Sequence, residues 1–138
     1  MIVNEGNEMS DGSELYEKGL TIRKTVLGED HVERSLNAAT DFTRPLQELV
    51  TEFGWGAVWG RDGLDHRTRS LINLAMLTAL NRQVELAVHV RGALRNGCTL
   101  QEIQEVLIQT AAYCGLPAAL EAFRTASDAL VAAGVDLG

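Results

Sequence analysis

Two ionisable side chains, Glu85 and His89, stand four residues apart inside an apolar segment of the chain. If this segment is helical, both side chains lie on one face, so the carboxylate can contact the imidazole. A neighbouring carboxylate orients an imidazole and raises its pKa, which suits a proton donor near neutral pH. A surface ion pair or a hydrogen-bonded core histidine has the same spacing. On the pattern alone, such a structural role is more frequent than a catalytic one.

Arginine is concentrated around this pair. Residues 61–96 hold six arginines and three acids, so this segment carries +3 in a chain of −7, and the remainder carries −10. A cationic segment in an acidic chain indicates a local site for an anion. Arg67 and Arg69 fall in the first turn of an expected helix, where cations oppose the macrodipole. An arginine that faces a pocket there suits a substrate carboxylate, with Arg69 as first candidate and Arg61 or Arg67 next.

Trp55 and Trp59 stand among four glycines within residues 54–63. Their large flat rings are suited to line a pocket. They are equally suited to fill a core, and the two interpretations have equal weight. The four glycines predict an irregular end for the helix that precedes them.

These residues must be positioned by helices, because periodicity and capping signals predict an all-α fold, a compact bundle of about six to seven helices. Asp65 is a good N-cap, and Thr99 with Glu102 forms a capping box. The expected helices are 13–27, 30–39, 41 into the glycine segment, 65–80, 82–96, 99–114 and 117 onward. Residues 1–12 are expected to be disordered and 13–134 to form a single domain. The segments Leu71–Leu80 and Val84–Leu94 are more apolar than a small monomer needs, which indicates subunit contacts.

Composition narrows the function classes. The net charge of −7 argues against a nucleic-acid partner, and no apolar stretch approaches a membrane span. No secretory signal is visible, so a cytoplasmic location is expected. Cys98 and Cys114 are sixteen positions apart, without metal-ligand spacing to any histidine. They are expected to be reduced thiols, at least one of them packed as a small apolar residue, with a disulfide as the less frequent alternative. No metal or cofactor motif is present.

At this point the sequence resembles a known family, the 4-carboxymuconolactone decarboxylases of the wider alkylhydroperoxidase D-like superfamily. The matching segments are GLTIRKTVLGEDHVERS, WGAVWGRDGLDHRTRSLINLAML, ALNRQVELAVHVRGALRNGCTLQEIQEVLIQTAAYCGLPAA and the EAF that follows. They span roughly residues 19–123. The resemblance implies an all-α fold, a hexamer built as a trimer of dimers, and cofactor-free conversion of 4-carboxymuconolactone to 3-oxoadipate enol-lactone and carbon dioxide. His89, Glu85 and Arg69 occupy positions that match the family's characteristic residues.

The superfamily's peroxidase branch carries two cysteines on the helix that ends in the matching histidine. In this chain those positions are Arg82 and Glu85, and the branch's upstream glutamate is matched by Ser70. Disulfide-based peroxide reduction is therefore strongly disfavoured. The chain also departs from the decarboxylase pattern, with Leu120 where the family usually has Asn and Arg124 where it often has His. The substrate can therefore differ from that of the family.

The chemistry implied by the resemblance needs no cofactor, because the leaving carboxylate is joined through a C=C bond to the lactone carbonyl, which takes up the electrons. The expected roles are a proton from His89, a grip on the small anionic lactone by Arg69, Arg61 or Arg67, and exclusion of water by Trp55 and Trp59. Two alternatives stay open. One is a related enzyme that acts on another lactone or a polyketide-like acid, and the other is a non-catalytic helical oligomer.

Overall fold

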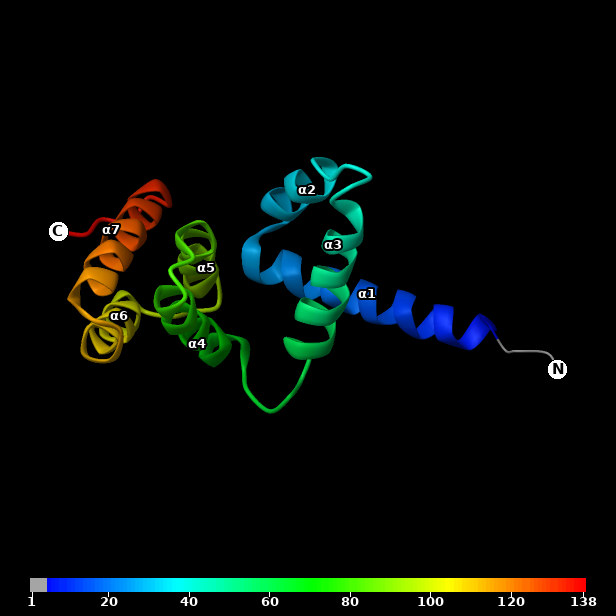
Figure 1. Cartoon of the computed structure of the whole chain (residues 1–138), viewed down its shortest axis with the longest axis horizontal. Helices are drawn as coiled ribbons and strands as arrows, with labels where there is room; N and C mark the ends of the chain where they lie inside the picture. Colours follow the sequence, from blue (N-terminus) through cyan, green and yellow to red (C-terminus); the bar gives the residue numbers. More distant parts are fainter. Residues whose placement is uncertain (1–4) are drawn as a thin grey trace. The chain divides into compact units, whose positions relative to one another are not determined.

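The computed structural model describes residues 5–138, with side chains from Glu14 onward. Over these residues seven α-helices and one π-helix make up the regular structure, and no strand occurs, so the all-α prediction is confirmed (Figure 1). The chain divides into two compact units, with the boundary between Gly63 and Leu64.

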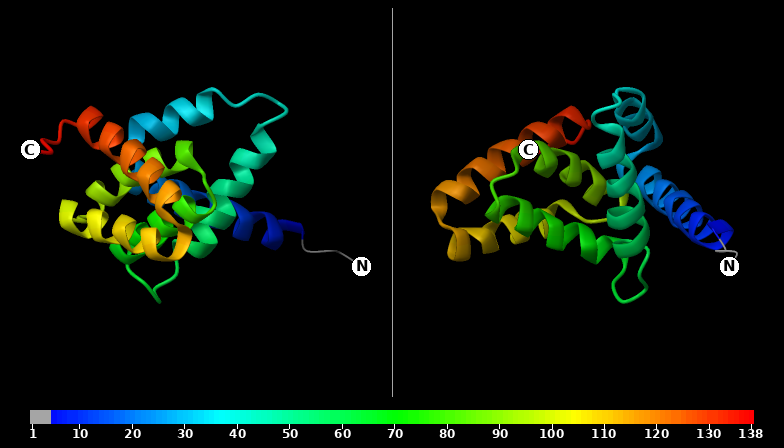
Figure 2. Two further views of the ribbon diagram at one scale, coloured as in Figure 1. Left: turned by 60° about the vertical axis from the view of Figure 1, so that its left-hand side comes forward. Right: turned by 45° about the vertical axis from the view of Figure 1, so that its right-hand side comes forward.

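The first unit is built on α1 (Glu5–Leu27), which packs against the π-helix η1 (Val50–Val58) (Figures 1 and 2). Two short helices, α2 (Glu29–Asn37) and α3 (Arg44–Leu49), connect them. As predicted, α1 ends before Gly28, whose φ of 94° is available to glycine at little cost. The helix begins at Glu5, inside the segment 1–12 for which disorder was expected, and residues 1–4 of that segment lie outside the described residues.

Glycines allow the backbones of α1 and η1 to come unusually close. A Cβ atom on Gly19 would clash with the Thr51 carbonyl group and lie 2.7 Å from the Gly56 nitrogen. A Cβ atom on Gly56 would lie 2.5 Å from the Leu15 oxygen. Because all of these obstacles are backbone atoms, only glycine fits at these two positions without a shift of the helices.

The glycine segment is helical as far as Val58 and irregular from Trp59 to Gly63, so the predicted irregular end is present but begins after Gly54 and Gly56. From Val50 to Val58 the chain continues α3 as a π-helix, and the Trp59 amide donates to the Gly54 carbonyl at 3.0 Å, an i→i−5 bond. Nine residues of π-helix are uncommon, because most examples are single-turn bulges, frequently at functional sites. The predicted start also shifts from Asp41 to Arg44, because hydrogen bonds between Thr40 and Thr43 form a turn first.

The second unit contains α4 (His66–Ala79), α5 (Gln83–Arg95), α6 (Leu100–Cys114) and α7 (Leu116–Ala132), the green to red helices of Figures 1 and 2. Its core lies among all four helices. The most deeply buried members are Leu74, Leu86, Val90, Ala93, Leu107 and Ala122. The same unit confirms the predicted capping signals: the Asp65 carboxylate accepts from the Thr68 amide at 2.7 Å, and Thr99 and Glu102 form the reciprocal capping box. Asn81 ends α4 in the left-handed region, at φ 56°.

The apolar sequence of α4 predicts a helix that is buried on every side. In the single chain one side of it is exposed. Ile72, Met76 and Leu80 are 40%, 48% and 63% exposed. They recur at intervals of four residues and therefore form one stripe. The opposite face, which includes Leu74, packs into the core. Among the helices of residues 5–138, none combines the length and apolar character that a membrane span requires.

Candidate active site

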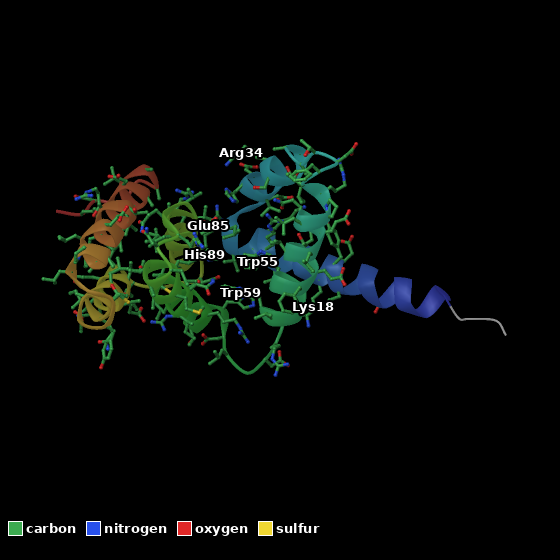
Figure 3. The ribbon with its side chains drawn as sticks, viewed as in Figure 1. Lys18, Arg34, Trp55, Trp59, Glu85 and His89 are labelled. Carbon is green, nitrogen blue, oxygen red and sulfur yellow. The ribbon has the colours of Figure 1, made fainter. Side chains whose placement is uncertain are left out.

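The expected catalytic pair lies on α5 in the second unit. Both side chains are labelled in Figure 3; Glu85 is exposed, and His89, one turn later, is half-buried. A residue that the sequence did not identify, Asn73 on α4, places its amide nitrogen 3.5 Å from Nδ1 of His89. When this amide donates to Nδ1, the neutral ring carries its proton on Nε2. His89 therefore has an amide partner, Asn73, in addition to Glu85, the partner that the sequence spacing predicts.

A second amide ties the start of α4 to the end of α5. The side-chain nitrogen of Asn96 donates to the Ser70 hydroxyl at 2.8 Å and to the His66 carbonyl group at 3.3 Å. Ser70 is fully buried. The position that holds a glutamate in the peroxidase branch therefore serves here to join two helices. Each amide contact has a sequence signal that the motifs did not include. One is a lone Asn in the apolar run of α4 and the other an Asn at the end of α5, because an amide that is partly removed from water on folding needs a hydrogen-bond partner.

The two arginines at the start of α4 differ in their surroundings. Arg67 forms an ion pair with Glu102, whose other carboxylate oxygen accepts from the Thr99 amide in the capping box. The guanidinium of Arg67 therefore joins the beginnings of α4 and α6. Arg69 is half-buried in the first turn of α4. Because the Glu102 carboxylate already neutralises Arg67, Arg67 is the weaker candidate to hold an anion, and the expected order with Arg69 first is kept.

The remaining predicted residues lie in the first unit. Trp55 lies on η1 and Trp59 directly follows it, with ring centroids 4.8 Å apart and planes inclined at 33°. They are only 6% and 7% exposed and pack with Val26 of α1. Arg61 follows η1 and is exposed. The tryptophans therefore form much of this unit's apolar core.

The predicted residues thus fall into two groups. The first unit holds Trp55, Trp59 and Arg61. The second unit brings His89 and Asn73 together and places Glu85 one turn from His89, with Arg67 engaged elsewhere. Among the described residues, no group of three His, Cys, Asp or Glu side chains is arranged to hold a metal ion.

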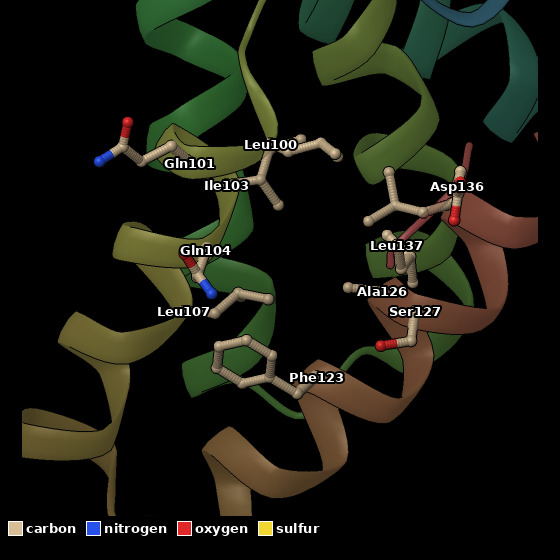
Figure 4. A pocket seen from close by; sticks show the side chains of 11 residues that line it. Leu100, Gln101, Ile103, Gln104, Leu107, Phe123, Ala126, Ser127, Asp136 and Leu137 are labelled. Atoms are coloured by element: carbon tan, nitrogen blue, oxygen red, sulfur yellow. The ribbon is translucent and has the colours of Figure 1, made fainter.

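A cavity of about 480 Å³ lies between α6 and α7 in the second unit (Figure 4). Its walls combine apolar side chains, among them Ile103, Leu107 and Phe123, with the polar side chains of Gln104 and Ser127. None of the predicted site residues lines it. The charged side chain at its edge is Asp136, which would repel an anionic acid. The cavity is therefore a poor candidate for a carboxylate substrate.

Both cysteines are free thiols, as predicted. Cys98 is buried and directs its sulfur toward the Arg67 carbonyl group at 3.5 Å, whereas Cys114 is exposed. Burial raises the pKa of the Cys98 thiol, which keeps it protonated and unreactive. Arg82 and Glu85, at the positions of the peroxidase cysteines, supply no sulfur.

Comparison with known proteins identifies the family. The model of the carboxymuconolactone decarboxylase family matches residues 44–128, more than half of the chain. The chain belongs to this family. It is 48% identical over 108 residues to a nitrosuccinic acid decarboxylase of Metarhizium robertsii, which covers 78% of this chain and 76% of that protein. It is 42% identical over 120 residues to a 4-carboxymuconolactone decarboxylase of Acinetobacter baylyi, which covers 87% of this chain and 90% of that protein.

The resemblance inferred from the sequence motifs is therefore confirmed, and the chain is a carboxy-lyase of the carboxymuconolactone decarboxylase family. Both relatives are named as decarboxylases but for different acids. The alternative of a non-catalytic helical oligomer is therefore not supported.

Proposed function

We propose that this enzyme decarboxylates a small acid that carries a second carboxylate, with 4-carboxymuconolactone as the first candidate and 3-oxoadipate enol-lactone and carbon dioxide as its products. The observation that carries the proposal is the 42% identity, over 90% of its length, to a relative named for this reaction. The protocatechuate branch of aromatic catabolism is the corresponding setting.

The reaction requires an electron sink, a proton donor and a grip on the charged substrate. As the C–C bond to the leaving carboxylate breaks, its electron pair passes through the C=C bond to the lactone carbonyl group and gives a dienolate. A proton delivered to carbon completes the reaction, so atoms and charge balance without a cofactor. The protein's contribution is to hold the carboxylates, stabilise the enolate oxygen and supply that proton.

His89 is our candidate for the proton donor. The Asn73 side-chain amide lies beside Nδ1 and can orient the ring, which leaves Nε2 as the nitrogen for proton transfer. Glu85, one turn away on α5, favours the protonated ring electrostatically. Replacement of Glu85 by Gln should therefore reduce turnover less than loss of His89 and move the pH optimum downward, because the imidazolium loses a nearby anion.

Arg69 is our candidate for the residue that holds a substrate carboxylate, since its planar guanidinium can bind both carboxylate oxygens. Arg61 and Arg67 are the secondary candidates, and the Glu102 ion pair makes Arg67 the weaker of these. A water-excluding role for Trp55 and Trp59 belongs to the same proposal, because their large apolar rings suit the wall of a pocket.

Nitrosuccinic acid is a second candidate substrate, favoured by the 48% identity to a relative named for it. Loss of carbon dioxide from its nitro-bearing carbon would leave a nitronate, which a proton on carbon converts to a nitroalkane that keeps one carboxylate. The chemical demands match those of the lactone: a leaving carboxylate beside an electron sink, a second carboxylate and one proton. Leu120 and Arg124, where the chain departs from the lactone-decarboxylase pattern, both lie on α7, and both are exposed in the single chain.

Turnover of the two acids by one purified preparation tests the proposal. Loss of carboxymuconolactone absorbance and release of carbon dioxide from nitrosuccinate should be measured at equal concentrations and corrected for spontaneous decay. We expect kcat/KM for one acid to exceed that for the other by at least about tenfold. A ratio of this size requires a difference of only about 1.4 kcal/mol in the binding of the two transition states. If neither acid is consumed faster than in buffer, the substrate assignment is wrong.

We also propose that the enzyme works as a hexamer, a trimer of dimers. Support comes from the first unit, where Phe42, Leu46 and Phe53 are 94%, 60% and 62% exposed in the single chain. They belong to the helical apolar pattern of residues 42–57, and so large an apolar face is rarely left open to water. Light scattering at micromolar concentration should give six times the 15.0 kDa chain mass. A monodisperse monomer would contradict this.

A further inference from the structure

Arg23 of α1 is an unexplained buried cation. Its side chain is only 6% exposed, although arginine is almost never fully buried without a partner. The Nη1 atom donates to the Thr51 hydroxyl at 3.0 Å, and that hydroxyl donates in turn to the Gln47 carbonyl group at 2.8 Å. The chain thus provides a neutral hydroxyl where a buried guanidinium normally has an anion.

The rest of the guanidinium environment is also incomplete. The Nε atom of Arg23 is buried without a hydrogen-bond partner among the described residues, and so is the side-chain oxygen of Gln47. Within the part of the chain whose side chains are described, no carboxylate lies within ion-pair distance of Arg23. Burial lowers the pKa of Arg23, with the Tyr16 phenol as an opposing influence. A buried charge in this condition is costly, and an arriving anion would offset part of that cost.

The surroundings have further features of a binding site. Thr51 belongs to the π-helix η1, one turn before Trp55, and π-helical segments occur frequently at functional sites. Gly19, which precedes Arg23 on α1, and Gly56, which follows Thr51 on η1, allow the two backbones to lie in close contact. The guanidinium therefore stands on a rigid frame, which favours the fixed geometry that carboxylate binding needs.

We propose that Arg23, with Thr51, forms a carboxylate-binding site in the first unit, and that its ligand is a small organic acid. The choice of a carboxylate follows from the enzyme class, because a carboxy-lyase must bind at least one carboxylate. The choice of a small acid over the side chain of another protein molecule follows from the low exposure of Arg23, since little of this residue is open to a partner surface. None of the motifs used to predict the site includes Arg23.

Succinate binding tests this site without any turnover. The chain has two tryptophans, both in the core beside α1, so their fluorescence reports on this unit. We expect saturable succinate-dependent fluorescence change in the wild type, and a dissociation constant about 10- to 100-fold higher in Arg23→Met, the range for loss of a charged hydrogen bond. Arg34→Met removes the same charge from an exposed position of α2 and should bind as the wild type does.

Arg23→Lys provides the second variant, because it keeps the charge and loses the planar fork. It should bind succinate more weakly than the wild type and more tightly than Arg23→Met. Succinate should also raise the melting temperature of the wild type and not that of Arg23→Met, at constant ionic strength set with sodium chloride. Unchanged succinate affinity in Arg23→Met overturns the proposal. Loss of assembly with unchanged succinate affinity also overturns it, and assigns the missing carboxylate to another copy of the chain.

Discussion

Replacement of Gly56 by alanine should disrupt the packing of α1 against η1. The new Cβ atom would lie 2.5 Å from the Leu15 oxygen and 3.1 Å from two Leu15 side-chain carbons. The carbonyl oxygen belongs to the backbone of α1 and cannot rotate away, so the helices must separate. Overpacking of this kind costs about 1–3 kcal/mol.

Gly54 gives a matched control on the same π-helix, because nothing lies within 4 Å of the position that a Cβ atom would take there. Both substitutions remove the same backbone freedom from the unfolded chain, so that contribution cancels between them. The remaining difference in the free energy of unfolding, about 1–3 kcal/mol, isolates the steric clash. Urea unfolding followed by tryptophan fluorescence measures it in the unit concerned. Equal unfolding midpoints for Gly54→Ala and Gly56→Ala, with equal slopes, would refute the close approach of the two helices.

Three further predictions concern the second unit. Thr99→Ala removes the reciprocal cap of α6 and should lower the free energy of unfolding by about 0.5–2 kcal/mol; an unchanged melting temperature would contradict the cap. Hydrogen bonds from Thr68 hold the pKa of Asp65 below its usual value, so the folded state binds this proton less readily than the unfolded state. The ionised Asp65 carboxylate therefore stabilises the folded state at neutral pH, and this stabilisation is lost as the pH falls through the lowered pKa. The melting temperature of Asp65→Asn should accordingly depend less on pH, below about pH 5, than that of the wild type. The double variant Cys98→Ala with Cys114→Ser should keep most of the decarboxylase turnover, and thiol-dependent peroxide reduction lost in this variant would show that the thiols matter after all.

The second unit was the easier one to predict from the sequence. Its helices are bounded by local signals, such as the Asp65 cap, the Thr99 capping box and the Gly115 turn, and local signals act independently of the rest of the fold. The partner of His89 was harder to find. Asn73 is sixteen residues away on another helix, and no spacing rule connects it to His89.

The first unit shows what sequence periodicity misses. A period of 3.6 residues describes α-helices, so the π-helical register of η1 had no counterpart in the pattern used to predict it. The apolar residues of α3 and η1 were correctly assigned to a helix, but Phe42, just before α3, and Leu46 are exposed in the single chain. Arg23 gave no signal at all, because a single arginine in an amphipathic helix is ordinary until its burial is known.

The most direct test of the central claim is to measure the turnover of a correctly folded His89→Gln variant. Circular dichroism and light scattering should first show that its helix content and assembly match those of the wild type. With the better of the two acids as substrate, we expect kcat to fall roughly 10²–10⁴-fold, the range for loss of a general acid. Wild-type turnover in this variant would contradict the account and exclude His89 as the proton donor.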